Sequence, residues 1–283
     1  THLQNTNSAI RRWEHNSDKD KAGYVDLMYK WNLGGGSVLD FSVGGMYRDK
    51  KRDSFFNEYT FDSATGSKDP QYQGTDWNNY DELLFVARKY GNISDPLNYD
   101  ATEKIGAGYG LVKYTYGRWE LIGGVRVEHT NQGYTLKFPT ESADPKGNQK
   151  YTDVLPSFHA KYGVHENANL RLSYARSINR PSFFEIVPYS IINEDYKEKG
   201  NPDLKHTVAD NVDFRYEFFP KSSEQFMIGA FYKYLKDPIE YGLLNEGQDT
   251  YYKPMNFGNA TNLGLEVDIM KYFNWFGIKA NYT

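Results

Sequence analysis

Residues 211–218 read Asn-Val-Asp-Phe-Arg-Tyr-Glu-Phe, and polar and apolar side chains alternate at every position. Alternation with a period of two predicts a β-strand that carries the apolar side chains on one face and the charged ones on the other. A buried ion without a partner costs on the order of several kcal/mol, so the charged face must meet water or polar groups. The stretch therefore predicts a sheet with an apolar outer surface and a wet interior.

The same division recurs along the chain. Segments 119–130, 154–164 and 263–269 separate apolar from charged positions in this way, whereas segment 104–116 places glycines on alternate positions of one face, which predicts a flat strip there. About ten strands are predicted, each long enough to cross a bilayer at a tilt. They cover residues 24–31, 38–48, 104–116, 119–130, 152–164, 170–178, 208–219, 225–236, 262–271 and 275–282.

The connections between these strands alternate in length. Short ones, such as 117–118 and 165–169, are followed by long ones, such as 131–150 and 179–206, and the longest spans about 49–101. Short turns at one end and long loops at the other are typical of an antiparallel outer-membrane β-barrel. Within the longest loop, 77–90 repeats apolar residues at helical spacing, which predicts a short surface helix.

Composition agrees with a membrane barrel and excludes several other classes. The chain has 283 residues, a net charge of -4, an aromatic content of 17% and a mean hydropathy of -0.76. Tyrosine, with 25 copies, suits the boundary between hydrocarbon and water because its ring is apolar and its tip polar. No apolar run reaches the length of a transmembrane helix, and no basic segment indicates a nucleic-acid partner. Cysteine is absent, and no metal or cofactor motif occurs.

Several motifs beyond residue 98 resemble those of TonB-dependent receptors, the active importers of the Gram-negative outer membrane. Residues 123–130 (GGVRVEHT) resemble a barrel strand of that family, and 170–183 (LRLSYARSINRPSF) resemble the strand and rim before its largest loops. Residues 200–205 (GNPDLK), 231–239 (FYKYLKDPI) and 262–266 (NLGLE) are similar to the elements that follow. The order and spacing of these motifs together point to this family more specifically than any single motif does.

The resemblance implies a barrel of about twenty-two strands whose lumen holds an N-terminal plug domain. Residues 1–283 are then expected to be a partial barrel domain without the plug, truncated after Asn281, Tyr282 and Thr283, where a closing strand would end in an aromatic residue. The implied partners are outer-membrane lipid and lipopolysaccharide, the protein's own plug domain and the TonB complex. A surface lipoprotein is left open as a further partner, and the cargo as a glycan, siderophore, vitamin or peptide.

Six charged residues are expected on the lumen-facing side of the strands. They could hold the plug through charge-assisted hydrogen bonds, or they could form a ladder of salt bridges with neighbouring strands, and the sequence leaves both open. These residues are Arg126, Glu128, Arg171, Arg215, Glu217 and Glu266. Arg180 and Pro181, at the start of the loop 179–206, are expected to fix the backbone rather than to contact a ligand.

Aromatic side chains in the long loops are candidate ligand contacts, since their rings can stack on a sugar or a siderophore. The alternative is that they pack against one another. The candidates are Trp77, Tyr189, Tyr196, Tyr251 and Tyr252.

Three functional classes remain at this stage. The first is the barrel portion of an energised importer, which is not an enzyme. The second is a passive porin or structural barrel, with loops folded inward and no plug. The third is a complete ten-strand outer-membrane protease, for which His129 or His206 must lie within hydrogen-bond reach of an aspartate.

Overall fold

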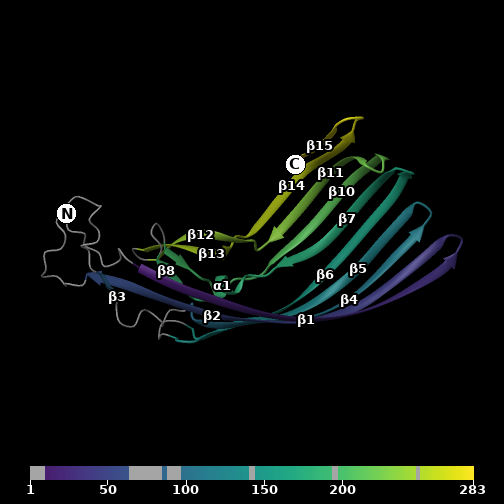
Figure 1. Cartoon of the computed structure of the whole chain (residues 1–283). Coiled ribbons are helices and arrows are strands. Elements are labelled where there is room, and N and C mark those ends of the chain that lie inside the picture. Colours follow the sequence, from purple (N-terminus) through teal and green to yellow (C-terminus); the bar gives the residue numbers. More distant parts are fainter. Residues whose placement is uncertain (1–9, 64–84, 88–96, 140–143, 193–196, 247–248) are drawn as a thin grey trace.

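The computed structural model describes residues 10–63, 85–87, 97–139, 144–192, 197–246 and 249–283, and most of them form one curved antiparallel sheet (Figure 1). Its ten main strands follow one another in chain order. They are β1 (Ile10–Gly34), β2 (Ser37–Ser63), β4 (Tyr99–Tyr116), β5 (Trp119–Leu136), β6 (Lys146–His165), β7 (Ala168–Asn179), β10 (Thr207–Lys221), β11 (Glu224–Lys236), β14 (Asn259–Tyr272) and β15 (Gly277–Tyr282). No helix in the described residues is long and apolar enough to cross a membrane.

All ten predicted strands are present, but several are longer than predicted. β2 continues to Ser63 and β4 begins at Tyr99, so the predicted loop 49–101 is wrong at both ends. The extension of β2 is held by ion pairs to β1, including Arg52 Nε to Asp18 Oδ1 at 2.7 Å. These pairs join residues 34 positions apart, so alternation within β2 alone does not reveal them.

The helix predicted over 77–90 is also wrong where it can be compared with the structure. Phe85–Ala87 forms strand β3, which pairs antiparallel with Phe61–Ser63 at the end of β2. The rest of the predicted helix lies outside the described residues. Pairing with a partner strand has here overridden the local spacing of apolar residues.

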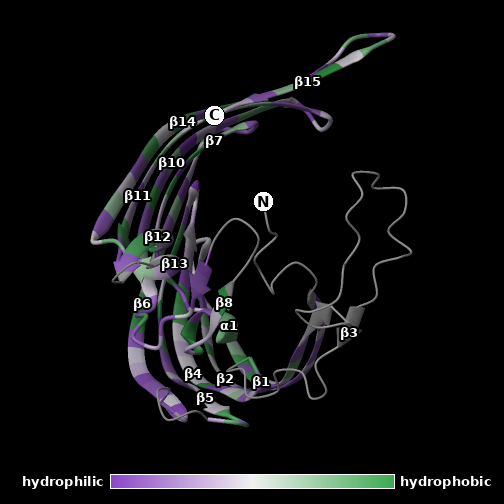
Figure 2. Ribbon diagram, turned by 90° about the vertical axis from the view of Figure 1, so that its left-hand side faces the viewer, coloured by the Kyte–Doolittle hydropathy of each residue, from purple (hydrophilic) through white to green (hydrophobic). Residues whose placement is uncertain are grey.

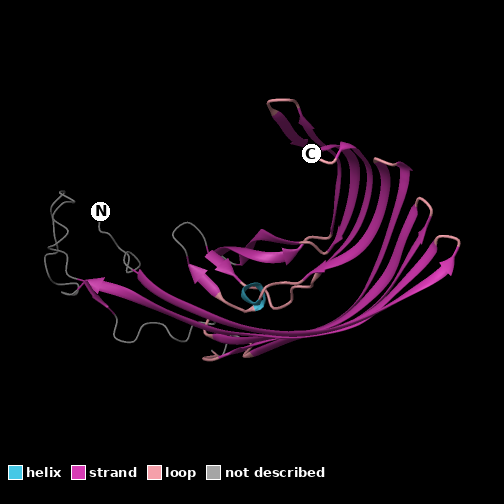
Figure 3. Cartoon of the chain, turned by 45° about the vertical axis from the view of Figure 1, so that its right-hand side comes forward, coloured by secondary structure: helices cyan, strands magenta, loops and turns pink. Residues whose placement is uncertain are grey.

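The long connections carry a second, smaller sheet. Helix α1 (Phe183–Ile186), β8 (Ser190–Ile192) and β9 (Lys197–Lys199) follow β7, and the hairpin of β12 (Ile239–Glu246) and β13 (Asp249–Asn256) follows β11. The four strands join in the order β12-β13-β9-β8. Figure 3 shows that this sheet and α1 lie within the bowl of the large sheet, near the end that carries the long loops. We call that end the loop end and the opposite one the turn end.

Contacts with the loop after β7 identify the concave face of the large sheet. The Phe183 ring of α1 lies over Lys50, with Nζ at 5.6 Å, and Gln132 Nε2 donates to the Pro181 carbonyl at 2.7 Å. The strand register places Lys50 opposite Glu103, Glu103 opposite Gln132, and Gln132 opposite Gln149. Residues directly opposite one another share a face, so the concave side can be followed residue by residue across the sheet.

The convex face is apolar and exposed. Val25, Leu27, Phe214 and Leu265 are 68%, 67%, 49% and 66% exposed, respectively, on strands at both ends of the sheet. In 211–218 of β10, Val212 is also exposed on this face, while Tyr216 and Phe218 are half-buried on it. Figure 2 shows the curvature that separates the two faces. The predicted arrangement, apolar outside and charged inside, is the one observed.

The described sheet does not close into a ten-strand barrel. Within the described part of the chain, β1 pairs only with β2 and β15 pairs only with β14. Each therefore has one edge of backbone hydrogen-bonding groups without a described partner strand, as the sequence predicted.

One glycine on the concave face makes room for an aromatic bridge. The Tyr109 ring of β4 passes over Gly44 of β2, and its hydroxyl donates to Asp26 Oδ1 of β1 at 2.6 Å. A Cβ at Gly44 would lie 2.5 Å from Tyr109 Cε1 and 2.4 Å from Asp26 Oδ1. Only glycine at position 44 permits this bridge, which links β4 to β1 across β2 on the concave face without a backbone shift.

Substitution Phe214→Lys is expected to destabilise the folded barrel in lipid by about 2–4 kcal/mol, because it places an ammonium group on the hydrocarbon-facing surface. The measurement is folding of the full-length protein into lipid bilayers as a function of urea concentration. Ser173→Lys is the control, since Ser173 lies on the concave face beside Asp213. Equal stability of the two variants would contradict the assignment of the faces.

Substitution Gly44→Ala is expected to destabilise the protein by about 1–3 kcal/mol, because the new methyl group overlaps the Tyr109 ring. The same urea titration measures the effect. Adding Tyr109→Ala should recover part of the loss by removing the overlap. Gly106→Ala is the matched control, as a Cβ at Gly106 meets no atom within 4 Å; a larger effect there than at Gly44 would refute the steric explanation.

Candidate functional site

The six charged residues predicted to face the lumen lie on the concave face, and they are paired with one another. Arg126 Nε donates to Glu128 Oε1 at 2.5 Å along β5, and Arg171 Nε of β7 donates to Glu217 Oε2 of β10 at 2.7 Å. Arg215 Nη2 lies 3.5 Å from Glu266 Oε2. These pairs form the ladder that the sequence allowed. Contact with a plug remains a prediction.

A hollow of about 490 Å³ lies against this wall towards the turn end. Both signs of charge line it, and no three His, Asp or Glu side chains in the described segments gather closely enough to hold a metal ion. The charged lining residues are Glu120, Lys161, Arg171, Asp213 and Arg215, and His159 lies among them. The hollow can therefore accept a polar surface that offers both donors and acceptors.

Residues 180–206, which we call the inward loop, are tied to the concave wall by polar contacts at both ends. Arg180 reaches Glu128 through Nη2 and donates from Nε to Thr130 Oγ1 at 3.1 Å. At the far end, Gln149 Nε2 donates to the Pro202 carbonyl at 2.9 Å. The backbone-fixing position predicted for Arg180 and Pro181 matches these contacts.

Helix α1 is a single capped turn held over cations. Ser182 Oγ accepts from the Glu185 backbone at 3.3 Å, while Glu185 Oε2 accepts from the Ser182 backbone at 2.6 Å, which forms a capping box. The Phe183 ring lies 5.5 Å from Arg52 Cζ in addition to its contact with Lys50. A cation over an aromatic ring contributes on the order of 0.5–2 kcal/mol, depending on burial.

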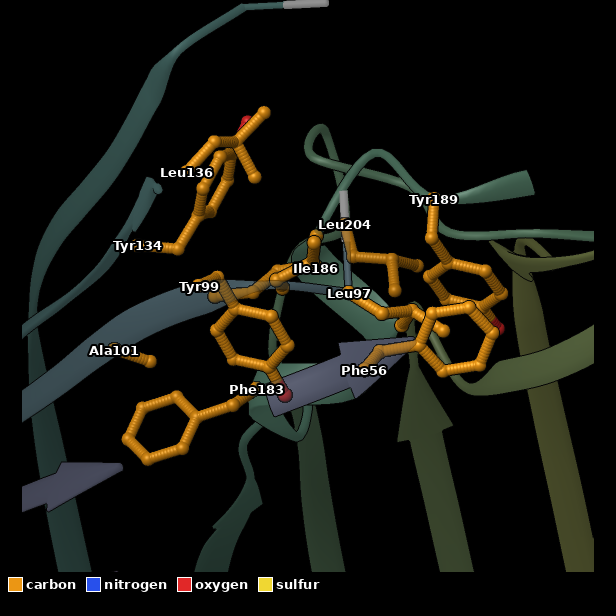
Figure 4. Close-up of a cluster of buried hydrophobic side chains, with 11 residues drawn as sticks. Phe56, Leu97, Tyr99, Ala101, Tyr134, Leu136, Phe183, Ile186, Tyr189 and Leu204 are labelled. Carbon is orange, nitrogen blue, oxygen red and sulfur yellow. The ribbon is translucent and has the colours of Figure 1, made fainter. Parts of the chain in front are cut away.

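Apolar side chains fill the space between the inward loop and the wall (Figure 4). Those from the loop pack against others from β2, β4, β5 and the segment before β4. The cluster contains Phe56, Leu97, Tyr99, Ala101, Tyr134, Leu136, Phe183, Ile186, Val187, Tyr189 and Leu204. It is the one hydrophobic core that the described residues form on the concave side, and it makes the inward loop part of the folded structure rather than a free excursion.

Tyr189 belongs to this core, so its prediction as a ligand contact is corrected. Its side chain is 1% exposed, its ring packs against Phe184 at 4.2 Å, and its hydroxyl donates to Glu198 Oε1 at 2.5 Å. Burial raises the pKa of the Tyr189 hydroxyl, and the Glu198 carboxylate raises it further by favouring the protonated form. The tyrosine joins α1 to the small sheet instead of facing a ligand.

Tyr251 and Tyr252 of β13 lie where the two long connections meet. They pair in parallel with Lys197 and Glu198 of β9, and Lys199 Nζ lies 3.8 Å from the centre of the Tyr251 ring. Tyr252 is 39% exposed. Of the remaining candidates, Trp77 and Tyr196 lie outside the described residues. Tyr252 thus keeps an accessible ring, whereas one face of Tyr251 is covered by lysine.

His206 meets one condition of the protease alternative. Its Nε2 lies 2.9 Å from Asp153 Oδ1, and its ring stacks on Tyr151 with 4.0 Å between centroids. The pair is largely buried between the inward loop and β6, and it acts as a fourth polar anchor of that loop, after Arg180, Gln132 and Gln149. His129 lies on the convex face, with Nδ1 2.9 Å from Thr152 Oγ1. The open sheet also lacks the closed ten-strand barrel that the alternative requires.

Sequence reasoning missed the anchors Gln132, Asp153 and Phe183. Gln132 lies in 131–150, which was predicted as a loop although β5 continues into it, whereas Asp153 lies in the predicted strand 152–164, so only the face of Asp153 could have been assigned. Their partners could not, because Gln132 and Pro181 are 49 positions apart and Asp153 and His206 are 53 apart. The motif RPSF at 180–183 was the available signal for the loop itself.

Comparison with known proteins agrees with this architecture. The family model described as outer membrane protein beta-barrel family matches residues 1–283. No curated protein matches the chain by sequence.

Solved structures with the same fold are receptors and transporters. The siderophore receptor PiuA from Acinetobacter baumannii is 16% identical to this chain, with a TM-score of 0.64. The match covers 95% of this chain and 38% of the PiuA chain. The ferric citrate transporter FecA is 12% identical with a TM-score of 0.60, covering 92% and 33%. The copper transporter OprC is 14% identical with a TM-score of 0.59, covering 93% and 36%.

The chain spans less than two fifths of the length of each of these three structures. At identities of 12–16% the similarity shows the fold alone. It therefore confirms the barrel fold that the resemblance to TonB-dependent receptors implied. The chain belongs to the outer membrane protein β-barrel family of the Gram-negative outer membrane, and its fold is that of the TonB-dependent receptor barrels.

Proposed function

We propose that this chain is the barrel portion of a TonB-dependent receptor that imports a scarce nutrient. Residues 1–283 supply one side of the lumen wall and two of the cargo-facing loops. The observation that carries the proposal is the inward loop, which four polar anchors and an apolar core hold against the concave wall. A loop fixed in this way offers cargo a preformed binding surface. Binding to a preformed surface costs less conformational entropy, because the loop is already ordered.

The charged concave wall between the inward loop and the turn end suits contact with a plug domain. Lys161, Arg171 and Asp213 give the hollow both signs of charge, and their exposed atoms can pair with a polar protein surface. Pairing within the ladder keeps Arg171 and Arg215 from being buried alone when a plug covers them. A plug would separate from a polar wall more readily than from an apolar one, which suits a receptor whose lumen must open for cargo.

Energy coupling through the TonB complex follows from the same assignment. The solved barrels of this fold include PiuA, named as a siderophore receptor, and OprC, named as a copper transporter. The cargo class of this chain is left as a scarce nutrient, with glycan, siderophore, vitamin and peptide as candidates. A surface lipoprotein would favour glycan or peptide.

A passive porin is the second candidate, because a loop folded into the lumen is also what a porin would show. The two differ in conductance. Full-length protein in a planar bilayer is expected to show no steady ion current, since a plug would fill the lumen. Stable open channels in the intact protein would favour the porin.

Uptake is expected to depend on inner-membrane energy. Cells that carry the full-length receptor should grow on its limiting nutrient, and growth should stop when TonB is deleted or the proton gradient is collapsed. Cells with an unrelated porin for the same nutrient serve as the control. Uptake that persists without TonB would contradict an energised importer.

Substitution Arg180→Ala should loosen the inward loop, because it removes the contacts to Glu128 and Thr130 and leaves the Glu128 carboxylate, which is 8% exposed, with one cation fewer. Removing one partner of a largely buried ion pair costs about 3–5 kcal/mol. Faster proteolysis within 180–206 and about tenfold weaker nutrient uptake are expected at limiting concentration.

Arg176→Ala is the matched control for that variant. Arg176 makes a comparable bidentate pair with Asp210, Nε to Oδ1 at 2.9 Å and Nη2 to Oδ2 at 3.0 Å, but its side chain is more exposed and lies on the other face of β7. Uptake should change little. If nutrient uptake falls equally in both variants, the inward loop is not a binding surface for cargo.

A further inference from the structure

Strand β12 forms an open edge of the small sheet. The strand order is β12-β13-β9-β8, so β12 pairs with β13 on one side and, among the described residues, with no strand on the other. Figure 3 shows that the small sheet lies within the bowl of the large one, near the loop end. The open edge therefore belongs to the interior of the receptor rather than to its lipid-facing surface.

Two contacts identify which residues of β12 direct their backbone groups outward. Pro254 of β13 has no N–H, and its carbonyl accepts from Nδ2 of Asn201, which follows β9 on the far side of β13, at 2.9 Å. The Phe257 N–H donates to the Pro238 carbonyl at 3.0 Å, which gives the same alternation just before the strand. Bonding alternates along an antiparallel pair. Every second residue in 239–245, starting at 239, therefore directs its N–H and C=O away from β13.

This edge lacks the features that usually protect sheet edges. Lysine, proline or a bulge commonly prevents a foreign strand from pairing there. Residues 241–245 (YGLLN) contain neither charge nor proline, and the register with β13 has no bulge. Leu243 and Asn245 are exposed, and their outward backbone groups have no partner in the part of the chain that the structure describes. The edge can therefore accept a further strand.

Side chains beside the edge differ between the two faces of the small sheet. Leu243 is 62% exposed and lies opposite Tyr252, and Tyr241, 47% exposed, shares their face. Glu240 is exposed on the other face. A strand added beside β12 would meet apolar side chains on one face and a carboxylate on the other.

The spacing of the outward groups identifies the class of ligand. One donor and one acceptor recur at every second residue, about 6.6–7 Å apart. An extended polypeptide repeats its own N–H and C=O groups at this spacing, whereas a glycan, a siderophore or a vitamin does not. In strand addition the main chain supplies affinity, and pockets for alternate side chains supply selectivity.

We propose that the open edge of β12 binds nutrient peptides by strand addition, and that peptides are the cargo of this receptor. The peptide lies extended along 239–245, with alternate apolar side chains beside Leu243. Backbone bonds supply most of the contacts, so peptides of many sequences are accepted if they keep this alternation. The inference rests on the import function proposed above and narrows its cargo to peptides.

The test uses a blocked octapeptide of alternating valine and lysine, with valine for the apolar face and lysine for the face of Glu240. Calorimetry measures its binding to full-length receptor in detergent. One isomer carries N-methyl groups on all valines and another on all lysines. Alternate N–H groups of a strand point to opposite sides, so one isomer should bind about tenfold more weakly, or worse, while the other keeps its affinity. Equal affinities of the two isomers would overturn the proposal.

Two substitutions at one position separate the backbone from the side chain. Leu243→Pro removes an outward N–H at an edge, where proline is compatible with the strand, and Leu243→Ala keeps the backbone intact. Affinity for the octapeptide should fall about tenfold in the proline variant and about two- to threefold in the alanine variant. An equal fall in both would contradict backbone pairing. Heat-modifiable electrophoretic migration checks folding, and the methylated isomers decide the question if the proline variant does not fold.

Amide hydrogen exchange distinguishes cargo from other occupants of the edge. The amides of Leu243 and Asn245 should exchange fast in the full-length receptor and slowly once the octapeptide is bound. Slow exchange without the octapeptide would show that another segment of the receptor covers the edge, and it would overturn the proposal.

Failure of this inference can be told apart from failure of the import function. TonB-dependent nutrient uptake without octapeptide binding at millimolar concentration would refute peptide cargo alone. Uptake of a bound octapeptide that persists without TonB would refute the energised importer and leave the β12 site standing.

Discussion

Every backbone N–H and C=O group of a chain in lipid must find a partner within the protein, because hydrocarbon offers none. In this protein antiparallel pairing of ten strands meets that requirement between neighbours, from the β1–β2 pair to the β14–β15 pair, while the outer edges of β1 and β15 have no partner strand among the described residues. The pairing then fixes which side chains face outward, since neighbours in register share a face. The apolar convex face and the ladder of paired charges on the concave face are both consequences of this one arrangement.

The two faces use charge in different ways. On the concave side, Glu128 and Glu217 are 8% and 6% exposed, and both are held by arginines. Burying a carboxylate alone would be costly, so the ladder keeps the wall polar without leaving charges uncompensated. On the convex side towards the loop end, Lys19, Lys51 and Lys150 are exposed and make no ion pair within the described residues, whereas Lys137 pairs with Asp53. The carboxylates of the concave wall are thus held within the protein, while several convex cations are open to its surroundings.

The inward loop shows how a barrel of this kind gains a local core. A barrel wall has no apolar interior, yet Phe183, Tyr189 and Leu204 are almost fully buried against β2, β4 and β5. The strands extend beyond the apolar part of the convex face at the loop end, and their concave positions there turn apolar at Phe56, Tyr99 and Tyr134. That change of composition along the strand converts a polar wall into a surface on which the loop can pack.

The sequence by itself determined the strands, their two faces and the family, because alternation has a period of two and can be recognised within a segment such as 211–218. It also placed Arg126, Glu128 and Glu217 on the inner side. Only the tertiary structure decided how far β2 extends, that Phe85–Ala87 is a strand, and that Tyr189 is buried. Each of these depends on partners far along the chain, as in the His206–Asp153 contact across 53 positions, and local periodicity carries no information about such pairs.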